Sequence, residues 1–290
     1  MPPGADTCMI PHAMERNEEI DSPGIKGAWL SPQAARRRRF IDPQNEAVRW
    51  SNCNRQAWSE GRSPMVTVEA AISGRRSVRA FLAKPVPREL ILKILKIAGR
   101  APSGSNVQPW KVWVLEGAVK VEVARDLAER YDRGVGVPRE YNYYPEKWRE
   151  PYLARRRACG WGLYATLGIG RADKDKMHAQ HRRNFLFFDA PIGLIFSIDR
   201  DLELGSWLDY GMFLQSIMVA ARQFGLETCP QAAFLVFYDV LQRRLGIPAE
   251  QQIVCGMSLG YPDGTAKVNA FTPERMPAED FVTFVDRLQT

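Results

Sequence analysis

Three segments rich in small and polar residues carry groups that bind anionic or polar ligands. The first, residues 74–79, places three arginines and a serine directly after Gly74, where a helix is expected to end. Arginine side chains form paired hydrogen bonds with phosphate, and a serine hydroxyl adds another. On spacing alone, this segment is either a phosphate site or a solvated basic turn.

The second segment, residues 101–110, lies between an expected helix and an expected strand. Its small residues allow a ligand to approach the backbone closely, and Ser103, Asn106 and Gln108 offer side-chain donors and acceptors. Such a loop either hydrogen-bonds a polar heterocycle or polyol, or is an elaborate turn. The third segment, residues 225–233, follows a long apolar helix and presents backbone amides among small residues.

The spacing of apolar residues predicts the elements that must position these segments. It predicts helices over 67–73, 88–98, 118–131, 152–167, 207–224 and 238–245, and strands over 111–115, 190–198 and 252–259. Ser206 is expected to cap the start of the longest helix, and Gly225 to end it. We see no internal repeat.

Residues 132–152 interrupt this pattern with glycines and prolines and carry several aromatic residues. An irregular loop of about 20 residues within a compact domain is usually functional or mobile. We interpret it either as a lid, with Tyr143, Tyr144 and Trp148 over a flat ligand, or as a flap that packs on the domain or on a partner.

Taken together, the motifs resemble those of the nitroreductase family of FMN flavoproteins. The resemblance covers residues 65–285 and rests on five motifs in the family's order: Arg-Arg-Ser-Val-Arg at 75–79, Ala-Pro-Ser-Gly-x-Asn-x-Gln-Pro-Trp at 101–110, Gly225-Leu226 with Pro230, Leu-Gly-Tyr-Pro at 259–262, and Arg275 before Pro277. It implies an α+β nitroreductase-like fold, a mixed and mostly antiparallel sheet flanked by helices. It also implies an intertwined homodimer with FMN at the interface.

The resemblance implies roles for individual residues. Arg75 and Arg275 would bind the FMN phosphate, Ser77 the ribityl or phosphate end, and Arg79 the N1/O2 edge of the flavin ring. The loop at 102–108 would come from the other subunit, and the segment 230–233 would offer a backbone amide to flavin N5. The full expected set is Arg75, Arg76, Ser77, Arg79, Pro102, Ser103, Asn106, Gln108, Pro230, Gln231, Ala232, Ala233 and Arg275.

The sequence departs from common family patterns at three places. Ala232 and Ala233 stand where many relatives carry an acidic residue and a glycine, which affects the surroundings of N5. Pro273 occupies a position that is often basic, so Arg275 has less help at the phosphate. The first 64 residues have no counterpart in the short members of the family.

The activity that the resemblance implies is reduction of nitroaromatic or related flat electrophilic compounds with NADH or NADPH, by a ping-pong mechanism. No side chain is expected as a catalytic acid or base, since the flavin carries the chemistry. Alternatives within the family are a reductive dehalogenase of the iodotyrosine deiodinase type, a flavin destructase, or a quinone or enone reductase. No separate Rossmann site is expected, because neither Gly-x-Gly segment, at 134–136 and 168–170, has a third glycine.

Composition and charge narrow the class of protein. The chain has 290 residues, of which 45% are apolar and 25% charged, and 40 basic against 33 acidic residues give a net charge of +7. This mild excess suits anionic ligands without requiring nucleic acid. A distant alternative is a non-catalytic nucleic-acid-binding protein that uses Arg36–Arg39 and Arg155–Arg157, but it leaves the five motifs unexplained.

The cysteines and the lengths of the apolar runs indicate the cellular compartment of the protein. The five cysteines are far apart, which favours free thiols in a reducing compartment, and no secretory signal or membrane-length apolar run is found. We therefore expect a cytoplasmic protein without a membrane or nucleic-acid partner, and without a metal. His178 and His181 are interpreted as a polar helical face, and Cys229 as a packing residue.

The two ends of the chain differ from the periodic part. Residues 1–64 show no sustained periodicity and are expected to form a poorly ordered extension, whereas residues 65–290 form the FMN-binding domain. The apolar stripe within residues 281–288 needs a surface to dock on, and by the resemblance that surface belongs to the other subunit. Arg155–Arg157 form either a solvated helical surface or a site for a carboxylate or for the 2′-phosphate of NADPH.

Overall fold

The computed structural model describes residues 66–288. The chain divides into two units, Met1–Arg62 and Ser63–Thr290, and the second contains every element described below. The predictions made for residues 1–64, including Arg36–Arg39, lie outside the described residues.

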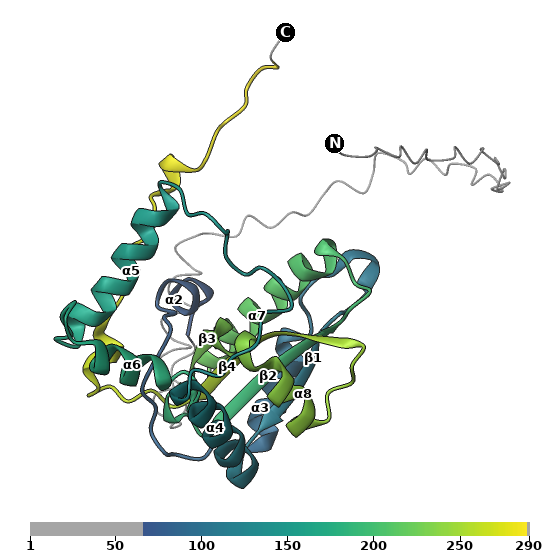
Figure 1. Ribbon diagram of the computed structural model, residues 1–290. Coiled ribbons are helices and arrows are strands. Elements are labelled where there is room, and N and C mark those ends of the chain that lie inside the picture. The colour runs from purple at the N-terminus through teal and green to yellow at the C-terminus, as the bar shows by residue number, and fades with distance from the viewer. Residues whose placement is uncertain (1–65, 289–290) are drawn as a thin grey trace, which may run out of the picture. The chain divides into compact units, whose positions relative to one another are not determined.

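A four-stranded sheet forms the centre of the domain, with the strand order β1-β2-β4-β3 and antiparallel pairing throughout (Figure 1). Its strands are β1 (Lys111–Leu115), β2 (Ile192–Asp199), β3 (Glu227–Gln231) and β4 (Gln251–Gly260). In addition to the pairing of these four strands, one isolated parallel bridge joins Ser77 to Thr228 of β3, which makes the pairing of the whole sheet mixed. The prediction of a mixed, mostly antiparallel sheet is therefore confirmed.

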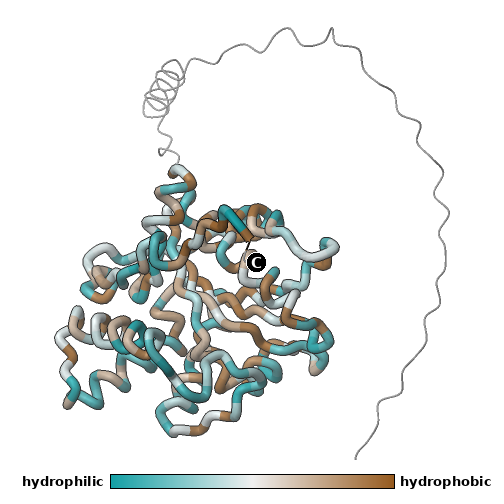
Figure 2. The backbone as a smooth tube through the Cα atoms, turned by 90° about the horizontal axis from the view of Figure 1, so that it is seen from above, coloured by the Kyte–Doolittle hydropathy of each residue, from teal (hydrophilic) through white to brown (hydrophobic). Residues whose placement is uncertain are grey.

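Helices cover both faces of this sheet because β2 and β4 are buried on both sides. On one face, α3 (Arg88–Ala98) and α7 (Leu204–Arg222) share an apolar cluster with Leu194 and Phe196 of β2. On the other, α4 (Gly117–Asp132), the 3-10 helix η4 (Ala232–Phe237) and α8 (Tyr238–Leu245) pack on Ile195 and Ile253. Figure 2 shows the apolar residues that run along the central strands.

Seven further helices complete the fold within residues 66–288. They are α2 (Val68–Ser73), α5 (Tyr152–Thr166), α6 (Lys174–Arg182) and the short 3-10 helices η2 (Gly104–Asn106), η3 (Phe187–Asp189), η5 (Lys267–Ala270) and η6 (Ala278–Asp280). In Figure 1, α5 projects away from the sheet with the C-terminal segment beside it. No residue of α5 is buried, although Gly162 lies against the ring of Phe271. No helix within residues 66–288 is long and apolar enough to span a membrane.

Most of the predicted elements are confirmed, with bounds that differ by a few residues. The expected cap of the longest helix is wrong: α7 begins at Leu204 with Glu203 as its N-cap, and Ser206 lies in the first turn, where its N–H donates to the Glu203 carbonyl. The helix ends at Arg222 with Gln223 as its C-cap, so the expected end at Gly225 is also displaced, and Gly225 turns the chain just after it with a φ of +69°. Strand β3 was not predicted, since it is short and contains Pro230, which a sheet tolerates at an edge.

Candidate active site

One cleft brings together predicted residues from two distant parts of the chain. Arg75, Arg76, Ser77 and Arg79 line it together with Arg275, and its volume is about 1280 Å³. The end of α2, one face of α5 and the segment 271–277 form its walls. The first and the last of the five motifs therefore meet, as the phosphate-binding prediction requires.

The backbone of the first segment is fixed from two sides. Val78 N–H donates to the Thr228 carbonyl at 3.0 Å, and Nη1 of Arg222 donates to the Gly74 carbonyl at 2.8 Å. A Cβ at Gly74 would come within 2.6 Å of Nη2 of Arg222 and within 2.9 Å of a backbone oxygen, so only glycine fits there without a shift. The helix stop at Gly74 is therefore also the point where α7 holds the arginine-rich segment.

Arg79 is held by an asparagine far along the chain. Its N–H donates to Oδ1 of Asn269 at 2.8 Å, and its own Nη1 donates to the Ser77 carbonyl at 3.1 Å. The buried Asn269 amide also donates to the carbonyls of Ala80 and Asp263. Asn269 thus connects the cleft segment to the loop before η5, and no signal in the sequence indicated this contact.

A largely buried ion pair, between Glu227 and Arg222, lies close to the arginines of the cleft. Burial raises the pKa of the Glu227 carboxyl, while Arg222, Arg76 and Arg75 act in the opposite direction. Within the described residues, Oε2 of Glu227 and Nε of Arg76 are buried without a hydrogen-bond partner. An unsatisfied guanidinium donor in the wall of an arginine-lined cleft fits an anionic ligand, and the arginine and serine donors are those that hold a phosphate ester.

The second segment lies outside this cleft, in a loop of unusual backbone geometry. Ser105, Asn106 and Gln108 have positive φ values of 49°, 58° and 52°. Such conformations cost free energy in residues other than glycine, and they concentrate at functional sites. Gln108 N–H donates to Oγ of Ser103 at 3.0 Å, and its amide donates to the Asn106 carbonyl at 3.2 Å, so Gln108 does support the loop.

The loop is attached to α7 by a carboxylate that we did not predict. Gly104 N–H donates to Oδ2 of Asp209 at 3.0 Å, and Asp209 is 9% exposed. The sequence offers one signal in retrospect, since Asp209 is the only acidic residue within the apolar α7. Pro102, Ser103, Asn106 and Gln108 do not reach the arginine cleft of their own chain, and the resemblance assigns this loop to the cleft of a second subunit.

The third segment has only part of the expected geometry. Both polar ends of the buried Gln231 side chain are engaged, since Nε2 donates to the Asn184 carbonyl at 2.7 Å and Oε1 accepts from Oγ of Ser258 at 2.6 Å. Its side chain is therefore not available to a cofactor, and the expected contact of this segment through a backbone amide stays a prediction. Pro230, Ala232 and Ala233 are partly exposed and keep accessible backbone.

Comparison with known proteins identifies the family. The family model "Nitroreductase family" matches residues 72–261. The chain belongs to the nitroreductase family. It is 42% identical over 220 residues to a 4-nitrobenzoate reductase of Nocardioides sp. strain LMS-CY, covering 75% of this chain and 89% of that protein. It is also 42% identical to a chloronitrobenzene nitroreductase of Comamonas testosteroni, with 75% and 96% covered.

Solved structures agree with this assignment. The crystal structure titled "FMN and NADPH-dependent nitroreductase NfnB" from Sphigopyxis sp. strain HMH is 34% identical in sequence, with a TM-score of 0.73. The match covers 76% of this chain and 100% of that chain. The predicted family and its α+β fold are confirmed.

The aromatic residues predicted as a lid form a cluster of their own, outside the arginine cleft. Tyr143 and Tyr144 pack edge to face at 4.7 Å, and Tyr144 lies 5.4 Å from Trp148. Tyr141 anchors the loop, because its ring packs on Trp207 and its hydroxyl donates to the Val254 carbonyl. The lid role of Tyr143, Tyr144 and Trp148 stays a prediction.

His178 and His181 lie on the exposed surface of α6, and Cys229 lies in the core. His178, on α6, contacts Oδ1 of Asp132 at 3.1 Å and stacks on Tyr131, and no group of metal-binding side chains occurs within the described residues. Cys229 is buried, and burial raises the pKa of its thiol to about 11. Such a thiol stays protonated at neutral pH, so it packs and does not act as a nucleophile.

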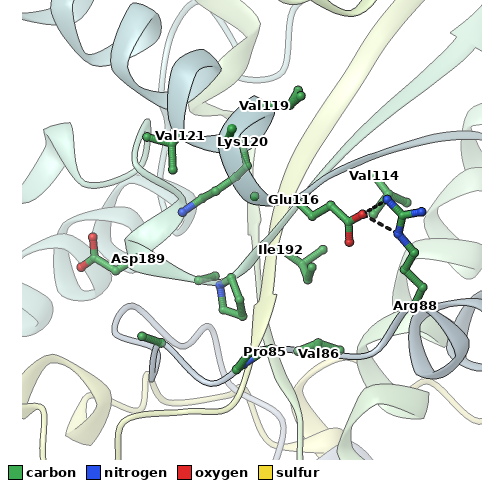
Figure 3. A pocket seen from close by; sticks show the side chains of 15 residues that line it. Pro85, Val86, Arg88, Val114, Glu116, Val119, Lys120, Val121, Asp189 and Ile192 are labelled. Atoms are coloured by element: carbon green, nitrogen blue, oxygen red, sulfur yellow. Dashed lines mark hydrogen bonds and ion pairs between the residues drawn. The ribbon is translucent and has the colours of Figure 1, made fainter.

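A second cavity, of about 770 Å³, lies where β1 ends and β2 begins, beside the start of α4 (Figure 3). Val114 of β1, Val119 and Val121 of α4 and Ile192 of β2 give it an apolar lining. At one end Arg88 is paired with Glu116, and at the other the Lys120 amine points toward Asp189, as Figure 3 shows. None of the predicted cofactor residues lines this cavity.

Proposed function

We propose that the chain is an FMN-dependent oxidoreductase that uses NADH or NADPH to reduce nitroaromatic or related flat electrophilic compounds. The observation that carries this proposal is the meeting of Arg75, Ser77, Arg79 and Arg275 in one cleft. Relatives named for nitrobenzoate and chloronitrobenzene reduction support the substrate class. The solved FMN- and NADPH-dependent relative supports the cofactor and the donor.

The chain's own residues provide a cradle for the cofactor. Arg75 and Arg275 hold the phosphate, and Ser77 hydrogen-bonds the same end. Arg275 is poised for this, because its Nη1 donates only to the backbone carbonyls of Pro273 and Glu274 within the described residues. Its neighbour Pro273 supplies no charge, so Arg75 and Arg76 neutralise the larger part of the phosphate charge.

When bound, FMN supplies the redox chemistry, in which it takes two electrons from the nicotinamide donor and delivers them to the acceptor. Arg79 places a positive charge at the N1/O2 edge of the ring, where negative charge collects on reduction. Asn269 and the Ser77 carbonyl keep the Arg79 backbone and guanidinium in place. The donor and the acceptor use the same face in turn, which gives a ping-pong mechanism without a side-chain acid or base.

A second copy of the chain completes the site. The loop with Ser103 and Asn106 lies outside its own cleft, and a strained loop held by Asp209 suits a partner's cofactor. The C-terminal segment carries apolar side chains that are 92% (Phe284) and 89% (Leu288) exposed in a single chain. The apolar cavity at the end of β1 offers them a surface to pack on, so we propose that each C-terminus docks there on the other subunit.

The compartment follows from the thiols. The three described cysteines are free thiols. Cys159 is exposed, and Cys229 and Cys255 are buried. Free thiols are typical of a reducing compartment, and we propose the cytoplasm.

The mechanism is tested by separating the two half-reactions. The FMN-loaded protein is mixed anaerobically with one equivalent of NADPH or NADH, and the reduced protein is then mixed with a nitroarene. The proposal expects loss of flavin absorbance in the first step, its return in the second, and parallel lines in double-reciprocal plots. Turnover of a halotyrosine without nitroarene reduction would favour the dehalogenase alternative, and preferential turnover of a quinone or enone would favour that reductase.

A further inference from the structure

The cleft contains more positive charge than one phosphate requires. Five arginines line it, namely Arg75, Arg76, Arg79, Arg155 and Arg275, together with the two carboxylates of Glu274 and Asp280. A phosphate monoester carries about −1.5 to −2 charges at neutral pH, so one guanidinium remains uncompensated after the cofactor binds. The volume of about 1280 Å³ also exceeds the ~300–1,000 Å³ of a usual single-ligand pocket.

Arg155 is the arginine that the cofactor prediction does not use. It lies on the face of α5 that also turns Ala158 and Cys159 toward the cleft, at the i, i+3 and i+4 spacing of one helix side. Its Nη2 contacts Sδ of Met276 at 2.9 Å, and no carboxylate pairs with it within residues 66–288. A thioether is a weak acceptor, so this guanidinium is free to exchange it for an anion.

The other two members of the basic run point elsewhere. The Arg156 guanidinium lies 4.9 Å from the centre of the Trp148 ring, and Arg157 is exposed on α5. Neither lines the cleft. The run Arg155–Arg157 is therefore not a uniform basic surface, and helix geometry selects Arg155 alone for the site.

We propose that Arg155 forms a second anion-binding subsite, which takes the phosphate or carboxylate group of a molecule that binds after FMN. Two sources have this chemistry, namely the 2′-phosphate of NADPH and the ring carboxylate of a nitroaromatic acid. Arginine binds either group through paired charged hydrogen bonds. The inference rests on the proposed function, since it assigns a specificity residue to the same cleft.

The test uses Arg155→Gln in the FMN-loaded protein, with Arg157→Gln as the matched control on the same helix. KM is measured for NADPH against NADH, and for 4-nitrobenzoate against nitrobenzene. We expect KM to rise about 10-fold for the member of one pair that carries the additional anionic group, and to stay unchanged for the member that lacks this group, because a charged hydrogen bond is lost. A rise for NADPH identifies the 2′-phosphate as the source, and a rise for 4-nitrobenzoate identifies the carboxylate.

The inference is overturned if each of the four KM values is the same in wild type and Arg155→Gln, or if KM rises equally for both members of each pair. Weaker FMN binding with both pairs unaltered overturns it as well, because Arg155 then serves the cofactor phosphate. Arg157→Gln is expected to match wild type throughout.

Calorimetric titration with adenosine 2′,5′-bisphosphate and with 4-nitrobenzoate separates this inference from the proposed function, because it requires no turnover. In one outcome, the wild type fails to reduce nitroarenes but binds one of these anions, with that binding lost in Arg155→Gln and kept in Arg157→Gln. In that case the proposed function is wrong and the anion-binding subsite is supported. A wild type that reduces nitroarenes but binds neither anion leaves the proposed function intact and removes the subsite.

Discussion

Oδ2 of Asp209 accepts a hydrogen bond from the Gly104 N–H at 3.0 Å, and this bond joins the core helix α7 to the loop that carries Ser103 and Asn106. The two residues are 105 positions apart. The loop contains three residues with positive φ, so its shape depends on outside support.

Replacement of Asp209 by Ala is therefore expected to damage both the fold and the cofactor site. The Gly104 N–H loses its acceptor, and the free energy of unfolding should fall by about 1 to 3 kcal/mol. FMN should dissociate more readily, while Asp209→Asn, which keeps an acceptor oxygen, should recover part of both losses. Denaturant unfolding and FMN titration measure these effects, with the exposed Asp201→Ala as control. Wild-type FMN affinity in Asp209→Ala would show that the loop does not contact the cofactor.

Cys159 provides a reporter for the cleft. It is exposed and lines the cleft, whereas Cys229 and Cys255 are buried. Alkylation should modify Cys159 rapidly in the FMN-free protein and several-fold more slowly once FMN is bound, because the cofactor narrows the access of the reagent to this thiol. Mass spectrometry of the labelled peptide gives both rates, and Cys159→Ser should remove one fast-reacting thiol. An identical rate with and without FMN would place the cofactor elsewhere.

The buried thiol of Cys229 should make stability depend on pH in the alkaline range. Burial raises its pKa from 9.0 to about 11, so the folded state retains this proton at pH values where the unfolded chain has lost it. Its contribution to stability is complete below pH 9 and is lost as the pH rises toward 11, with a slope of at most about 1.4 kcal/mol per pH unit. Cys229→Ala should flatten the profile between pH 9 and 10.5 in denaturant unfolding. A parallel profile in the variant would mean that the thiol is accessible to solvent.

The proposed dimer depends on the C-terminal stripe. Phe284→Asp places a charge where we expect an apolar seat on the other subunit, so the protein should become monomeric and lose FMN. Asp286→Ala, on the same segment, is the control and should stay dimeric, since the Asp286 side chain is 90% exposed. Light scattering after gel filtration gives the mass. A Phe284→Asp variant that keeps both its dimer and its flavin would show that the stripe does not hold the subunits together.

The sequence predicted best what depends on local chemistry. Gly74 ends α2 as expected, because a helix-ending glycine acts within one turn, whereas Thr67, expected as the first helical residue, is the N-cap. The arginines of the cleft were found because Arg75 and Arg275 belong to motifs with recognisable spacing.

Contacts between distant residues could not be predicted in this way. Asn269 holds Arg79 across 190 positions, and Asp209 holds Gly104 across 105, and neither pair leaves a periodic trace in the sequence. Gln231 belongs to the segment expected to offer a backbone amide to the cofactor, and its place in β3 turns its side chain into the core, where Ser258 and the Asn184 carbonyl bind it, a contact that the motif did not indicate. Strand alternation decides this direction, and β3 itself was not recognised.

The central claim is that this cleft holds FMN, and a visible absorption spectrum tests it most directly. Purified protein, and the supernatant after heat release, are compared for wild type and Arg75→Ala, with the exposed Arg125→Ala as control. The account predicts a flavin spectrum in wild type and Arg125→Ala, FMN in the supernatant, and strongly reduced occupancy in Arg75→Ala. A colourless wild type that takes up no added FMN, or full occupancy in Arg75→Ala, would contradict it.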